Sequence, residues 1–129
     1  MADEQQEMHD CINQCWTCRD ECQKLFFNHC LPEGGKHVEE DHAKVMMDCI
    51  QLCQAAADFM TRQSPLHSSV CSACADVCDA CADSCERIGG EEMEHCAQSC
   101  RDCAELCRHT AEMDVFGIAI KENDARVNT

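Results

Sequence analysis

The stretch that decides the fold is Cys71-Ser72-Ala73-Cys74-Ala75-Asp76-Val77-Cys78-Asp79-Ala80-Cys81-Ala82-Asp83-Ser84-Cys85. Its cysteines are separated by steps of three, four, three and four residues. Such steps return to one face of an α-helix, and their alternation marks the inner seam of a helix bundle. Most of the residues between them are polar or small, as on a solvated outer face. The stretch therefore predicts an amphipathic helix whose buried stripe is made of cysteine.

The same spacing recurs on both sides of this stretch. The first copy consists of Cys11, Cys15, Cys18 and Cys22, and the last of Cys96, Cys100, Cys103 and Cys107. A further segment has the same stripe with fewer thiols, namely His42, Met46, Cys49, Cys53, Ala56 or Ala57, and Met60. Cys30 follows Cys22 by eight residues and falls close to the same face. The chain thus carries four cysteine-bearing stripes.

Three breaks separate the stripes: the turn Leu31–Gly35, Ser64-Pro65 with Ser64 as a helix N-cap, and Gly89-Gly90. They predict helices over about 4–30, 36–63, 65–88 and 91–113 within one domain, residues 1–114. Short connections make sequential helices antiparallel neighbours. The expected fold is an all-α, up-down-up-down four-helix bundle with a cysteine-lined core. The tail, residues 115–129, begins with an apolar run and is expected to pack against the bundle, with a subunit contact as the alternative.

Composition alone does not predict a folded bundle. Only twenty of the 129 residues are Leu, Ile, Val or Phe, and the net charge is −15. This combination predicts disorder unless the sixteen cysteines supply the core. The acidic N-terminus has no signal-peptide pattern, so we expect a cytoplasmic protein with reduced thiols. No apolar stretch is long enough for a membrane span, and the acidic charge disfavours nucleic acid.

A whole stripe of cysteine indicates metal ligands, because Leu or Ile would fill a bundle core better. Cu(I) is soft and prefers sulfur ligands. If each thiolate bridges two ions and each ion takes two sulfurs, the capacity is about one Cu(I) per Cys. Each Cu⁺ replaces one proton, so the loaded core stays neutral. A zinc–tetrathiolate site would instead bury two negative charges. The expected ligands are Cys11, Cys15, Cys18, Cys22, Cys30, Cys49, Cys53, Cys71, Cys74, Cys78, Cys81, Cys85, Cys96, Cys100, Cys103 and Cys107.

Other classes of protein remain open at this point. A metallothionein-like Zn(II) or Cd(II) buffer and an iron–sulfur redox protein also use many cysteines. A copper chaperone would need a few exposed thiols of low pKa rather than a filled core. The sequence contains no nucleophile–base pair, phosphate-cradling glycine loop or dinucleotide fingerprint, so we do not expect an enzyme.

The stripes Cys11–Cys22 and Cys96–Cys107, with Cys71–Cys85 lengthened by one step, resemble those of the bacterial copper storage proteins. The resemblance extends over residues 8–113. It implies a cytosolic homotetramer that stores Cu(I) and admits the metal at one open end of the bundle. Cu(I) is the only cofactor that the resemblance implies. The cysteine-poor segment 36–63 departs from the cysteine-richest members of the family.

Methionine and histidine mark both ends of the predicted core. In an antiparallel bundle one end collects Met8, Met60 and His67, and the other collects His42 and Met46. All five lie on the inner stripes by register. Thioether and imidazole groups are weaker ligands than thiolates, so we expect these residues to extend the metal site at its two ends.

Overall fold

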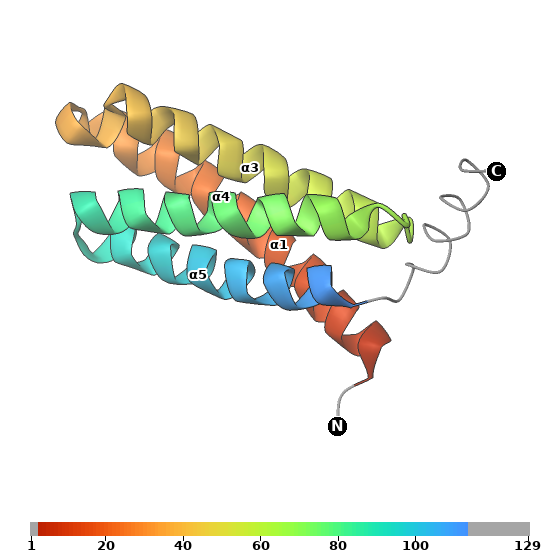
Figure 1. Ribbon diagram of the computed structural model, residues 1–129. Coiled ribbons are helices and arrows are strands. Elements are labelled where there is room, and N and C mark those ends of the chain that lie inside the picture. The colour runs from red at the N-terminus through yellow and green to blue at the C-terminus, as the bar shows by residue number, and fades with distance from the viewer. Residues whose placement is uncertain (1–2, 114–129) are drawn as a thin grey trace.

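The computed structural model describes residues 3–113, and in this part of the chain it is helical throughout apart from short turns (Figure 1). Four helices of 22 residues each form the bundle: α1 (Glu4–Leu25), α3 (Glu40–Thr61), α4 (His67–Ile88) and α5 (Glu91–Glu112). Between α1 and α3 lie a π-helical turn (Phe26–Cys30), the single turn α2 (Leu31–Glu33) and a 3₁₀ turn (Gly35–Val38). The all-α four-helix bundle is confirmed.

The four helices form a closed ring in which α1 packs against α3 and α5, and α4 packs against the same two helices. Contacts between sulfur atoms give their directions. Cys11 in the first half of α1 meets Cys107 near the end of α5, and Cys22 near the end of α1 meets Cys96 near the start of α5. Met46 in the first half of α3 meets Cys81 in the second half of α4, and Cys53 further along α3 meets Cys74 in the first half of α4. The pairs α1–α5 and α3–α4 therefore run antiparallel, and thiols of all four helices meet inside the bundle.

The first helix extends further than its sequence suggests. The turn expected from Leu31 onward begins only at Gly34, whose φ of 69° is the positive value that ends the helix. Pro32 stands in the first turn of α2, directly after the π-helical turn. The second long helix then begins at Glu40 instead of residue 36, because the 3₁₀ turn occupies Gly35–Val38.

The π-helical turn determines where Cys30 lies. In a regular α-helix, eight residues turn about 800°, which would leave Cys30 about 80° away from the stripe of Cys22. Here the Leu31 N–H donates to the Phe26 carbonyl, five residues back, so the turn accommodates one extra residue. The rotation is then that of about seven α-helical residues, within about 20° of the stripe. Cys30 is fully buried as a result.

The third long helix begins at His67, two residues later than the Ser64-Pro65 pattern predicts. Ser64 does not act as its N-cap: its hydroxyl accepts a hydrogen bond from the Leu66 N–H at 3.1 Å, and its carbonyl accepts one from the His67 N–H at 3.2 Å. Both bonds close a turn around Pro65. The break at Gly89-Gly90 is where the sequence places it, and both glycines have positive φ.

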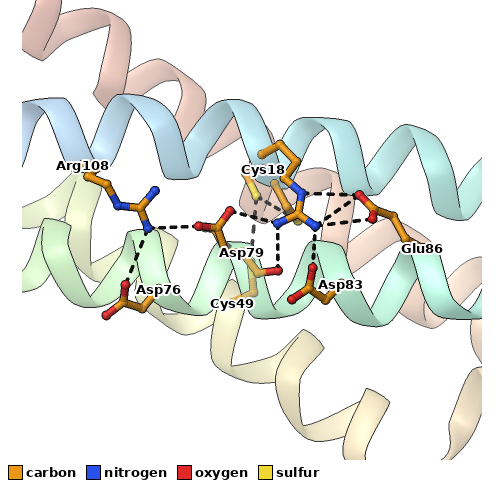
Figure 2. A network of polar contacts seen from close by, with 10 residues as sticks. Cys18, Cys49, Asp76, Asp79, Asp83, Glu86 and Arg108 are labelled. Carbon is orange, nitrogen blue, oxygen red and sulfur yellow. Dashed lines mark hydrogen bonds and ion pairs between the residues drawn. The ribbon is translucent and has the colours of Figure 1, made fainter.

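Charged side chains link α4 and α5 on the outside of the bundle (Figure 2). Arg101 reaches Asp79, Asp83 and Glu86, and Arg108 donates to Asp79 at 3.0 Å. Partial burial acts to raise the pKa of Asp79, but hydrogen bonds from Arg108 and Arg101 outweigh it and leave that pKa below its ordinary value. The network joins α4 to α5 on the outside of the bundle.

No helix in residues 3–113 combines the length and the apolar character required to cross a membrane. The tail, residues 115–129, and the end of the predicted domain at residue 114 lie outside the described residues.

Candidate metal centre

All sixteen cysteines are free thiols and all lie inside the bundle. The exposed fraction is zero for every cysteine except Cys96, where it is 2%. The structure therefore places each cysteine of the predicted ligand set in the core. Among the described residues, the buried polar side chains are His42, His67, Ser99 and Thr110, so this core contains no lysine, arginine or carboxylate.

The sulfur atoms form a continuous network along the middle of the bundle. Neighbouring Sγ atoms lie 3.5 Å apart for Cys15 and Cys107, 3.7 Å for Cys18 and Cys100, and 3.8 Å for Cys49 and Cys78. Three groups of four thiols have all their sulfurs within 4.8 Å of one another: Cys15, Cys74, Cys103 and Cys107; Cys18, Cys53, Cys78 and Cys103; and Cys18, Cys22, Cys49 and Cys100. Cys18 and Cys103 each belong to two groups. The groups therefore overlap and are not separate sites.

These spacings suit a metal that takes two or three sulfurs. With a metal–sulfur bond of about 2.3 Å, trigonal ligands lie about 4.0 Å apart and linear ligands about 4.6 Å apart. The observed 3.5–4.0 Å separations need shifts of about 1 Å or less to reach either geometry, within what side-chain torsions provide. A sulfur with neighbours on several sides, such as Cys18, can bridge two ions.

The thiols share their protons. Hydrogen bonds with Cys107 and Cys15 lower the pKa of Cys11, whereas hydrogen bonds with Cys103 and then Cys11 raise that of Cys107. Burial raises the pKa of Cys30 to about 11. A net negative charge in this core has no buried cation to offset it, and an uncompensated buried charge is costly. The network as a whole is therefore neutral at pH 7, and a monovalent cation that displaces a proton keeps it so.

The end of the core near the π-helical turn combines sulfur with nitrogen. The Nε2 atom of His42 lies 3.7 Å from the Cys30 sulfur, and the Sδ atom of Met93 lies 3.9 Å from it. The Nδ1 atom of His42 is 2.7 Å from the Ser84 hydroxyl, which fixes the orientation of the ring. Burial lowers the pKa of His42, so its imidazole is neutral at pH 7 and able to bind a metal.

Met46 contributes a thioether to the same half of the bundle. Its Sδ atom lies 3.4 Å from the Cys81 sulfur and 3.8 Å from that of Cys85, where α3 has no thiol of its own. Met93 and Ser84 were absent from the predicted site. Met93 could have been predicted, because it lies on the inner stripe of its helix. The contact of Ser84 with His42 could not, because it joins α4 to α3 and has no signal in the local sequence.

At the other end, Met8, Met60 and His67 are buried as their register indicates. The His67 Nδ1 atom lies 3.3 Å from the Ser64 carbonyl oxygen in the turn before α4. Met8 and Met60 also line a surface groove between α1 and α3.

The fold and the site together define a class of protein: a helix bundle whose interior is a connected set of thiols able to hold several soft metal ions. The chain belongs to the copper storage protein family, whose model matches residues 4–112.

Several solved structures are similar over most of the chain. The Nmul_A1745 protein from Nitrosospira multiformis is 48% identical with a TM-score of 0.80, over 83% of this chain and 96% of the other. The Cu(I)-bound copper storage protein BsCsp3 is 31% identical with a TM-score of 0.75, over 81% and 98% of the two chains. A cytosolic copper storage protein from Streptomyces lividans, described with five coppers, is 28% identical with a TM-score of 0.73, over 85% and 96%.

A curated relative, the uncharacterized cysteine-rich protein YhjQ of Bacillus subtilis, is 32% identical over 66 residues. The match spans 51% of this chain and 60% of the relative.

Proposed function

We propose that the protein stores Cu(I) inside the bundle and holds about one ion per cysteine through bridging thiolates. The observation that supports this best is the overlap of the three thiol groups at Cys18 and Cys103. Separate closed sites would not share sulfurs, whereas a chain of bridged ions requires that they do. The Cu(I)-bound relative with the same bundle supports the choice of metal.

The ligand set we propose is the complete set of sixteen cysteines, extended at one end by His42 and Met46 and at the other by Met8, Met60 and His67. The distances from His42 and Met46 to neighbouring thiols support their place in it. Met93 joins the set because its thioether contacts Cys30.

The role we propose is storage and not catalysis, and the Cu(I)-bound copper storage protein with the same bundle supports it. We further propose a cytosolic location and a homotetramer. The cytosolic description of the Streptomyces lividans relative supports the first. Family membership suggests the second.

The test is an anaerobic titration with Cu(I) in the presence of a competing chelator, with metal counted against protein. Storage predicts a tight endpoint well above about ten ions per chain. An endpoint of one or two ions would rule out storage and favour a chaperone.

A zinc buffer is the second candidate, since any of the three thiol groups has the four ligands of a closed zinc site. Because the groups share sulfurs, only Cys15, Cys74, Cys103 and Cys107 can be filled together with Cys18, Cys22, Cys49 and Cys100. Zinc in this core should therefore saturate at about two tetrathiolate sites. A Zn(II) endpoint above that number, or retention of Zn(II) against excess Cu(I), would favour the buffer.

A further inference from the structure

A groove on the outside of the bundle has a different character from the rest of the surface. It lies between the first half of α1 and the end of α3 and has a volume of about 780 Å³. Its lining combines large apolar side chains with uncharged polar ones and imidazole: Met8, Ile12, Trp16 and Met60, and Gln5, His9, Asn13, Thr61 and Gln63. We call it the Trp16 groove.

The lining of the Trp16 groove includes no Asp, Glu, Lys or Arg. Four other grooves on the described surface each contain at least one carboxylate. In a chain with 27% charged residues and a net charge of −15, a groove without Asp, Glu, Lys or Arg is a surface on which an apolar segment can dock without burying a carboxylate, ammonium or guanidinium group.

The chain contains such a segment where it leaves the described structure. Val115-Phe116-Gly117-Ile118-Ala119-Ile120 has no polar side chain and begins two residues after Met113, the last described residue. The end of α5 lies beside the start of α1, since the His109 Nε2 atom is 3.2 Å from a Glu7 carboxylate oxygen. Glu7 is directly followed by Met8, which lines the groove.

The connection is long enough to reach the groove. The seven residues 114–120 span about 23 Å when extended, and adjacent helix axes in a bundle are about 8–10 Å apart. The segment can therefore pass the end of α1 and arrive between α1 and α3. A tethered segment also has an effective concentration in the millimolar range, which a separate molecule rarely reaches.

We propose that residues 115–120 of the same chain occupy the Trp16 groove. Docked there, they cover the exposed side of Trp16, which is half-buried in the described structure. The proposal concerns the metal-free protein and does not depend on the identity of the metal.

Trp16 makes the proposal directly measurable, because it is the single tryptophan and the chain has no tyrosine. Intrinsic fluorescence of the full apo chain therefore reports on the groove alone. Removal of residues 114–129 should shift the emission to longer wavelength and raise the acrylamide quenching constant about twofold, since docking covers the open side of a half-buried ring. Far-UV circular dichroism of both proteins checks that the bundle remains folded.

Point variants exclude a general effect of truncation. Phe116→Asp and Ile118→Asp in the full chain should each reproduce the spectrum of the truncated protein, whereas the matched control Val127→Asp, beyond the apolar run, should not. An unchanged emission maximum and quenching constant in the truncated, folded protein would overturn the proposal. Emission that changes on dilution of the full chain, with truncation having no effect, would also overturn it and place a second copy in the groove.

Discussion

Loading the core with Cu(I) should release about one proton per ion and leave the net charge of the protein unchanged. The buried thiols hold their protons at pH 7, because no buried cation offsets a thiolate in the described core. Each bound Cu⁺ must therefore displace a proton. If all sixteen cysteines take part, complete loading releases about sixteen protons.

The same exchange sets the pH dependence of affinity. Since one proton leaves for each ion that binds, the apparent affinity should rise about tenfold per pH unit, or about 1.4 kcal/mol, as long as the pH stays below the pKa of the thiols. Burial raises the pKa of Cys30 to about 11. At the end of the core that contains Cys30, the apparent Cu(I) affinity should therefore rise with pH in this way throughout the neutral range.

The measurement is an anaerobic titration in weakly buffered solution with a pH indicator, repeated with a competing chelator at about pH 6, 7 and 8. Zn(II) serves as the contrasting metal: a tetrathiolate site displaces four protons for two charges, so each ion adds two negative charges to the initial −15 and changes the electrophoretic mobility. A Cu(I) proton ratio near zero, or an affinity independent of pH, would refute the reasoning, because either means that the apo core already contains thiolates.

Three further predictions follow from other parts of the structure. A ligand present at a thousand times its Kd stabilises the folded state by about 4 kcal/mol, and 1 kcal/mol corresponds to about 4 °C for a chain of this size; Cu(I) should therefore raise the calorimetric Tm by 15 °C or more, and an unchanged Tm would contradict binding to the folded bundle. His42→Leu removes the nitrogen that lies 3.7 Å from the Cys30 sulfur and should lower the Cu(I) endpoint by about one ion; an unchanged endpoint would exclude His42 as a ligand. Arg101→Ala should cost about 1 kcal/mol in urea denaturation at pH 7, since the ion pairs are partly exposed and screened. That cost should fall below about pH 4, because the pKa of Asp79 is lowered in the folded state and the stabilisation is lost as the carboxylate is protonated; an equal cost at both pH values would show that the contact with Asp79 contributes nothing.

The burial of the thiols was predictable because helical periodicity is a local property. Steps of three and four residues place Cys71–Cys85 on one face in any α-helix, and no alternative secondary structure puts all five on one side. The antiparallel order of the helices followed from the shortness of the connections. These two regularities were sufficient for the fold and for the thiol core.

The ends of the helices and of the core were less predictable, because they depend on competition between nearby groups. The Leu31-Pro32-Glu33 sequence is compatible with a turn or with a first helical turn, and the π-helical hydrogen bond from Leu31 to Phe26 decided in favour of the helix. Ser64 has the chemistry of an N-cap but bonds within the preceding turn instead. Contacts between helices, such as that of Ser84 with His42, arise only after the helices pack.

The sharing of Cys18 and Cys103 between groups of thiols has a consequence for how filling must be described. An ion that occupies one group uses a sulfur that the adjoining group also needs, so the arrangement open to the next ion depends on where the previous one went. Loading is then a sequence of rearrangements within one shared set of ligands and not the occupation of independent positions. A single dissociation constant multiplied by a number of sites cannot represent it. The natural variable is the distribution of partly filled species, each with its own geometry, that the bundle passes through between empty and full.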